Sequence, residues 1–245
     1  VLPKGWLAAL SLYRKELRME AAEETTGEIP ERAVTLDRIA GMESAKRALE
    51  VALAGEHAIV FVFNSNSQAP QLVRVGKRIA EDLGIAFHGL AYPACKCGNY
   101  GNRTSECRCK PVSMKSHLTR LARRSAEFDI WMDACCGKQA GMQVSPGESE
   151  DVMADRILAA RTIREIAGPD SESRELLTAY QKHVGKAIDE DRILGVARTI
   201  ARLEDSGRAL RPHHVAEALQ YQPTSHWWIW EWTGLEQLEI ATERR

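Results

Sequence analysis

The chain has 245 residues, of which 44% are hydrophobic, and this suits one large domain or two small ones with a buried core. Its 33 Lys and Arg residues nearly balance its 34 Asp and Glu residues, so a protein that is basic throughout is excluded. No apolar run approaches the ~20 residues that span a bilayer, and no basic stretch followed by a long apolar one opens the sequence. We therefore expect a cytoplasmic protein with no membrane partner.

Residues 1–40 are predicted to form an N-terminal helix and a linker. Apolar side chains recur at helical spacing within 6–24. The segment 25–38 follows, and its breakers Gly27 and Pro30 are typical of a connection. The first folded domain is therefore expected to begin after this linker.

Helix and strand patterns alternate through 41–145, which we predict to be the first domain. The apolar runs typical of buried strands lie at 58–63, 85–92 and 128–134. The segments predicted as helices lie at 42–54, 70–83 and 112–125. Strands that alternate with helices are joined by right-handed crossovers and form a mostly parallel sheet. We therefore expect an α/β fold with a small three-layer sheet of about three strands.

The composition changes after Ser145, and 146–222 is predicted to be an all-helical second domain. Breakers such as Gly168 and Gly185 separate four segments of helical pattern. These segments lie at 149–167, 172–184, 187–205 and 212–221. The remaining tail, 223–245, holds four of the six tryptophans of the chain.

Four of the six cysteines form two Cys-x-Cys pairs within 95–109. Disulfide frameworks usually spread cysteines along a small secreted chain, whereas close pairs are typical of metal sites. Four thiolates at one ion would leave no open position for water, so we expect a structural zinc site. Two disulfides or four free thiols are the alternative. The expected ligands are Cys95, Cys97, Cys107 and Cys109. The other two cysteines, Cys135 and Cys136, are neighbours in the sequence and are interpreted as buried structural thiols.

The segment 95–124 is strongly basic, since Glu106 is its only acidic residue. Such a local excess could contact the phosphates of DNA, with Tyr100 as a stacking ring. A solvated helix face beside a metal loop is the alternative interpretation. The basic residues are Lys96, Arg103, Arg108, Lys110, Lys115, Arg120, Arg123 and Arg124.

Three stretches of the chain together resemble a known family. They are 41–55 with the apolar run after it, the segment 95–111 (CKCGNYGNRTSECRCKP), and 192–203 taken with 211–221. They are similar to the helix before the nucleotide loop, the cysteine-rich insert and the C-terminal lid of the magnesium-chelatase-like AAA+ ATPases. The resemblance is greatest to the ComM type, which is linked to DNA processing in natural transformation. It implies ATP and Mg²⁺ as cofactors, AAA+ subunits as oligomeric partners and a five-stranded sheet with the nucleotide strand at its centre.

The chain departs from this family where nucleotide is handled. The family's phosphate loop falls on Asn64, Ser65, Asn66 and Ser67, which include neither the glycines nor the lysine that such a loop needs. The strand that ends in Asp-Glu and holds magnesium is missing, together with a long stretch around it. Three strands would remain of the AAA+ core, with 58–63 at the centre, followed by the lid-like helices. One strand becomes a new edge, which we expect the N-terminal helix or the tryptophan-rich tail to cover.

Other catalytic positions of the family have also changed. By the same match, the sensor asparagine falls on Pro93, the finger arginine near Glu127 and the lid arginine near Ile188. A shift of one residue in the match would offer Arg123, Arg124 or Arg192 instead. The pair His213 and His214 is interpreted as a feature of the lid helix rather than as a metal site.

The leading hypothesis is therefore a shortened, ComM-like protein that has lost ATP hydrolysis and acts by binding DNA or a partner subunit, with a structural zinc site. One alternative is a nucleotide-binding or active AAA+ ATPase that works through atypical residues. Others are a non-catalytic subunit of a mixed AAA+ ring and a gene remnant with no selected role.

Overall fold

The computed structural model describes residues 34–102, 105–135, 147–185, 188–204 and 209–223. The predicted N-terminal helix and the tryptophan-rich tail therefore lie outside the described residues. The elements below belong to one unit, Thr35–Arg245. A domain boundary at residue 146 stays a prediction.

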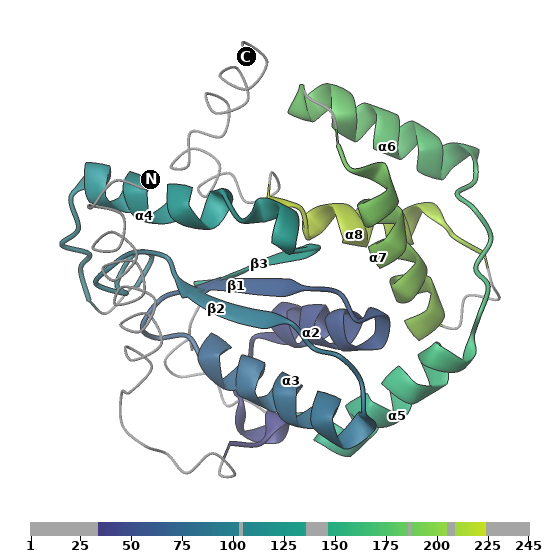
Figure 1. Cartoon of the computed structure of the whole chain (residues 1–245), viewed down its shortest axis with the longest axis horizontal. Helices are drawn as coiled ribbons and strands as arrows, with labels where there is room; N and C mark the ends of the chain where they lie inside the picture. The colour runs from purple at the N-terminus through teal and green to yellow at the C-terminus, as the bar shows by residue number, and fades with distance from the viewer. Residues whose placement is uncertain (1–33, 103–104, 136–146, 186–187, 205–208, 224–245) are drawn as a thin grey trace, which may run out of the picture. The chain divides into compact units, whose positions relative to one another are not determined.

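Three parallel strands form the sheet in the order β2-β1-β3 (Figure 1). The central strand β1 covers Ile59–Phe63, with β2 (Gly89–Pro93) on one side and β3 (Ile130–Ala134) on the other. Ile59 lies opposite Gly89 in one pairing and opposite Ile130 in the other. The predicted α/β class and the central position of the first strand are both confirmed.

Both outer strands begin later than predicted. The run 85–92 was expected to be extended throughout, but β2 starts only at Gly89, after the N–H of Ile59 has bonded to the carbonyl of His88. The ring of Phe87 folds over Gly89, where an added Cβ would lie 2.4 Å from it. At β3, the N–H groups of Asp129 and Ile130 share the carbonyl of Ala58, so regular pairing begins only at Ile130.

Helices cover both faces of the sheet. Figure 1 shows α4 (Pro111–Ala122) on one side, and α2 (Glu43–Gly55) and α3 (Ala69–Leu83) on the other. Two short 3-10 helices, η1 (Leu36–Arg38) and η2 (Ser125–Glu127), precede α2 and β3. Because side chains alternate along a strand, successive residues of β1 reach opposite layers. The core beneath α4 contains Val60, Val62, Ala94, Leu118, Leu121, Phe128 and Trp131.

The C-terminal region forms the four helices that the sequence predicts. They are α5 (Glu150–Thr162), α6 (Ser171–Val184), α7 (Glu190–Leu203) and α8 (Pro212–Gln220). Three begin at an N-cap side chain that accepts a backbone N–H, namely Ser149, Asp170 and Asp189. The first helix is shorter than the predicted 149–167, because Ile163 is already extended and Pro169 pairs with Leu210 in a bridge.

An ion-pair network joins α2 to the C-terminal helices. The buried carboxylate of Glu50 accepts from Arg47 at 3.0 Å and from Arg156 of α5 at 2.6 Å. Arg47 also reaches Glu217 of α8 at 3.0 Å, and Arg156 pairs with Glu148. The helices α5 and α8 are thereby fixed to the side of α2.

The end of α8 covers part of one sheet edge. The N–H of Trp131 in β3 donates to the carbonyl of Tyr221 at 2.8 Å. Within the described ranges, residues of the C-terminal region meet this edge, and the two segments predicted to cover a new edge, the N-terminal helix and the tail, lie outside those ranges. None of the described helices has both the length and the apolar character needed to cross a membrane.

Candidate functional site

The carboxyl ends of the three strands bring together the two segments of greatest interest. In open parallel sheets, ligands bind at this end of the strands. Here β1 is followed by Asn64–Ser67, and β3 is followed by Cys135. The strand β2 is followed by 95–109, which holds the four clustered cysteines and which we call the cysteine segment. The loop that the sequence match predicts to be a degenerate phosphate loop therefore lies beside the cysteines.

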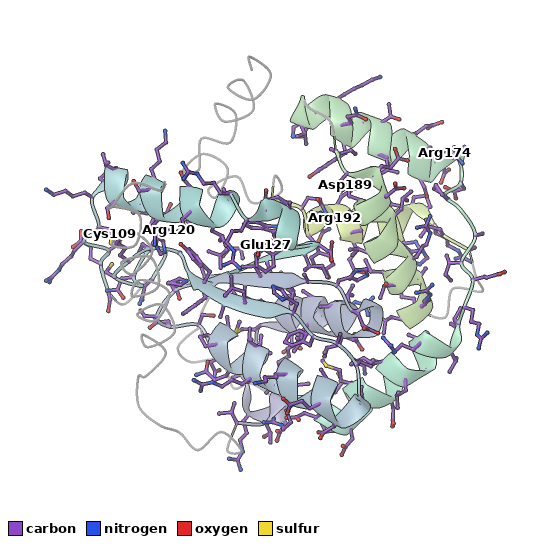
Figure 2. The ribbon with its side chains drawn as sticks, in the orientation of Figure 1. Cys109, Arg120, Glu127, Arg174, Asp189 and Arg192 are labelled. Atoms are coloured by element: carbon purple, nitrogen blue, oxygen red, sulfur yellow. The ribbon has the colours of Figure 1, made fainter. Side chains whose placement is uncertain are left out.

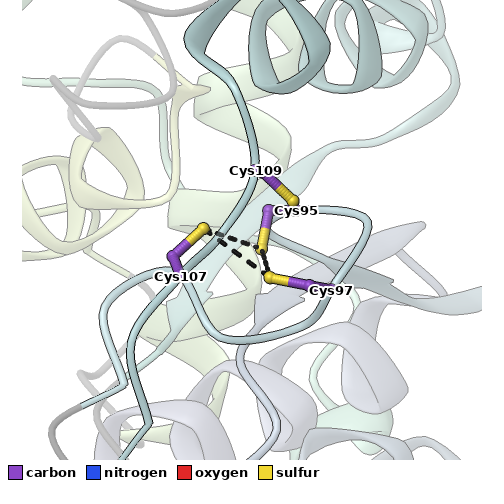
Figure 3. Close-up of side chains that lie close together, drawn as sticks. All are labelled: Cys95, Cys97, Cys107 and Cys109. Carbon is purple, nitrogen blue, oxygen red and sulfur yellow. Dashed lines mark hydrogen bonds between the residues drawn. The ribbon is translucent and has the colours of Figure 1, made fainter.

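The four cysteines of 95–109 form one cluster (Figure 3). The Sγ of Cys95 lies 3.4 Å from that of Cys97 and 3.6 Å from that of Cys107, and Cys97 and Cys107 are 3.7 Å apart. All four sulfur atoms, including that of Cys109, lie within 4.8 Å of one another. Four sulfurs at about 2.3 Å from one tetrahedral ion lie about 3.8 Å apart, so the donor set and its spacing fit zinc.

The surroundings of the cluster shift the pKa values of its thiols in different directions. Backbone N–H groups of Asn99 and Arg108 lower the pKa of Cys97 to about 6. Desolvation raises the pKa of Cys95, Cys107 and Cys109. A bound cation would favour the thiolate form of all four, which couples metal binding to proton release.

Hydrogen bonds fasten the cysteine segment to the loop after β1. The N–H of Ser65 donates to the carbonyl of Gly98 at 2.7 Å, and its Oγ donates to Asn99 Oδ1 at 2.7 Å. The amide of Asn102 donates to Ser65 Oγ at 2.8 Å and accepts from Asn66 Nδ2 at 2.6 Å. We call these four hydrogen bonds between 64–67 and 98–102 the loop contact.

The remaining polar groups of the loop after β1 are also used internally. The buried amide of Asn64 donates to the carbonyl of Cys135 and accepts the N–H of Asn66. The N–H of Ser67 bonds to the carbonyl of Asn64, and the N–H of Ala69 bonds to Ser67 Oγ. A phosphate loop offers such backbone N–H groups to its ligand. Here those of residues 65, 66, 67 and 69 already have acceptors within the protein.

The cysteine segment also approaches the sheet closely. Gly98 and Gly101 have φ values of 74° and 71°, which few other residues adopt readily. A Cβ on Gly98 would lie 3.6 Å from Ser65 Cβ, and one on Gly101 would lie 3.6 Å from Cys135 Cβ. The segment therefore occupies the space beside the carboxyl ends of β1 and β3.

The arginines that a shifted sequence match offers as catalytic substitutes bind elsewhere. Arg192 donates to the carbonyls of Ala126 at 3.0 Å and Phe128 at 3.3 Å and pairs with Asp129, all of which precede β3. Arg124 pairs with Glu127 at 2.8 Å. Figure 2 shows Arg192 and Glu127 well away from Cys109. These arginines thus lie toward the amino end of the sheet, opposite the loop contact.

The basic residues gather on the cysteine segment and on α4. The buried side of α4 contains Met114, Leu118, Leu121 and Ala122. Tyr100, which we considered as a stacking ring, is half-buried and packs against the core beneath α4. Arg103 lies outside the described residues. The other seven basic residues are all exposed: Lys96, Arg108, Lys110, Lys115, Arg120, Arg123 and Arg124.

A second group with metal-ligand side chains comprises Glu204, His213 and His214, whose ligand atoms lie within 4.8 Å of one another. The N–H of Arg211 donates to His214 Nδ1 at 2.9 Å, so the other ring nitrogen of the neutral side chain carries the proton. That nitrogen, Nε2, lies 3.2 Å from Glu204, which also pairs with Arg47. Desolvation lowers the pKa of His214 and favours this neutral form. The contacts therefore describe a helix cap, with no nitrogen lone pair of His214 left for a metal.

Comparison with known proteins gives one family match. Residues 145–222 match the family model described as magnesium chelatase, subunit ChlI C-terminal. This range contains the helices α5, α6, α7 and α8. No curated protein matches the chain. The chain thus carries a ChlI-type C-terminal domain, which supports its membership of the magnesium-chelatase-like AAA+ family.

Proposed function

We propose that the chain is a shortened, ComM-type member of this family that no longer hydrolyses ATP and acts by binding DNA. In this proposal, Cys95, Cys97, Cys107 and Cys109 hold a structural zinc ion. The observation that carries the proposal is the loop contact, because it engages the segment where the family binds phosphate. Thiolate ligation of this kind belongs to a reducing compartment, so the cytoplasm is the proposed location.

Zinc would cross-link the two ends of the cysteine segment. Cys95 and Cys97 follow β2, whereas Cys107 and Cys109 precede α4, so one ion would join the two ends of the segment. Joining those ends would hold Gly98–Asn102 against the loop after β1. Four protein ligands leave the ion no site for a reacting water, so its role would be structural.

The loss of hydrolysis follows from two features of the site. The backbone N–H groups that would bind phosphates already have acceptors within the protein, as in the bond from Ser65 to Gly98. The arginine Arg192, which could have stabilised transition-state charge, is held by carbonyls before β3. Phosphoryl transfer depends on such groups being positioned at the phosphates.

Binding to DNA is supported by the charge of the exposed surface. The cysteine segment and α4 together present seven exposed cations, while α4 itself contains no acidic residue. Phosphate contacts of this type give affinity without sequence readout. Since Tyr100 packs against the core, base stacking is not part of the proposal.

The test is the salt dependence of DNA binding by the full chain and by the variant Arg120→Glu/Arg123→Glu. Both residues are exposed, Arg120 in the last turn of α4 and Arg123 at its C-cap. We expect the negative slope of log affinity against log salt to become shallower by about 2, because each phosphate contact contributes about −0.9 to it. The matched control is Arg174→Glu/Lys182→Glu on α6, which makes the same change in net charge and should leave the slope unchanged.

A second candidate is a non-catalytic subunit of a mixed AAA+ ring. The match of the C-terminal region to the ChlI family model favours it, because the resemblance implies AAA+ subunits as oligomeric partners. If the wild-type protein shows no salt-dependent binding to duplex or single-stranded DNA at low salt, the DNA proposal is wrong. A stable complex with an intact AAA+ subunit, measured by native mass spectrometry, would then support the second candidate.

A further inference from the structure

A cavity of about 260 Å³ lies between the last turns of α5 and α7, away from the cysteine cluster. Its apolar wall comprises Ala159, Ala160, Ile163 and Leu203, and its charged part comprises Arg156 and Arg202. No acidic residue is among the described residues that line it. The cavity therefore combines hydrocarbon and guanidinium groups.

The guanidinium group of Arg202 has few hydrogen-bond acceptors among the described residues. Its Nε is buried and has no hydrogen-bond partner among the described residues. One terminal nitrogen donates to the carbonyl of Arg164 at 3.4 Å, and no described carboxylate lies within 4.0 Å of the guanidinium. Buried nitrogens of this kind are nearly always hydrogen-bonded, so the Nε of Arg202 is open to an acceptor that the described residues do not supply.

The charges around Arg202 do not compensate it. Arg156, the other arginine of the cavity, is already paired with Glu50 and Glu148. Burial lowers the pKa of His57, and the positive charge of Arg202 also acts to lower it, against the opposite effect of Asp129. A neutral His57 adds no competing cation, and Arg202 is not paired with any carboxylate of the described residues.

We propose that this cavity binds the oxyanion group, phosphate or carboxylate, of a small molecule through Arg202. The planar guanidinium group matches two oxygens of either group, and the bond is strengthened by charge. The apolar wall would contact the hydrocarbon part of the ligand. This proposal is independent of DNA binding, because no residue of the cavity belongs to the cysteine segment or to α4.

The test is calorimetric titration of the full chain with sodium phosphate and, separately, with sodium acetate, at ionic strength held constant with sodium chloride. We expect saturable binding of at least one anion by the wild type. Arg202→Gln should weaken it about tenfold or more, the usual effect of losing a charge-assisted hydrogen bond. Arg164→Gln, a change on the same surface outside the cavity lining, should bind like the wild type.

The two titrations distinguish the ligand chemistry. Binding of phosphate alone indicates a phosphate-bearing ligand, and binding of acetate indicates a carboxylate. Arg202→Lys keeps the charge but loses the two-pronged geometry, so intermediate affinity is expected even if the glutamine variant does not fold. The proposal is overturned if neither anion binds the wild type at millimolar concentrations, or if both Arg202 variants bind as tightly as it does.

Discussion

Replacement of Cys95 by serine is expected to remove bound zinc and to destabilise the protein. The side chain of Cys95 is fully buried at the end of β2, and its sulfur is within 3.6 Å of those of Cys97 and Cys107. Structural zinc contributes about 10–16 kcal/mol in small peptides, so the loss of one ligand of four should cost at least about 3 kcal/mol, and the loss of the ion more. Metal content measured by mass spectrometry, together with urea unfolding, checks this result.

The matched control for this substitution is Cys135→Ser. Cys135 lies near the same end of the sheet but outside the cluster, and its sulfur is 3.7 Å from the carbonyl of Val62, where a serine hydroxyl can also donate. The control should keep one zinc ion per chain. Equal zinc content in the wild type and in Cys95→Ser would contradict a four-cysteine site.

Substitution of Glu50 by alanine is expected to lower the free energy of unfolding strongly. The carboxylate of Glu50 is only 4% exposed and joins Arg47 to Arg156, which are 30% and 40% exposed. Removing one member of a buried ion pair usually costs about 3–5 kcal/mol. Because both arginines keep other acidic partners and partial access to water, we expect a loss of about 2–3 kcal/mol in the free energy of unfolding.

Glu43→Ala on the same helix provides the comparison. Glu43 is 77% exposed and pairs only with Lys46 among the described residues, at 3.1 Å. Lys46 is only 6% exposed, but Glu43 itself is in contact with water, so the loss should be about 1 kcal/mol and clearly smaller than for Glu50→Ala. If Glu50→Ala were as stable as Glu43→Ala, the network would not fasten α5 and α8 to α2.

The regular elements of this fold could be predicted because their signals are local. The period of apolar residues and the cap residues Ser149, Asp170 and Asp189 locate the C-terminal helices. The order of the strands in the sheet, by contrast, has no local signal in the sequence. It came from the resemblance to a family, since an apolar run such as 58–63 does not by itself indicate which neighbours it pairs with.

The clustering of the cysteines was also predictable, because their spacing constrains a short loop. The loop contact was not, since Ser65 and Asn102 are 37 residues apart and polar residues in turns have no pattern that indicates their partners. The same holds for Tyr221 at the edge of β3 and for Arg202 in its cavity. These contacts depend on how helices pack, and packing is a property of the whole fold.

The central claim is that the cysteine segment, held by zinc, occupies the place where this family binds nucleotide. Calorimetric titration of the zinc-containing full chain with ATP in the presence of Mg²⁺ tests this claim most directly. We expect no saturable Mg²⁺-dependent binding at millimolar ATP, because the N–H of Ser65 and its neighbours are already bonded within the protein. Magnesium-dependent binding in the micromolar range would contradict the claim.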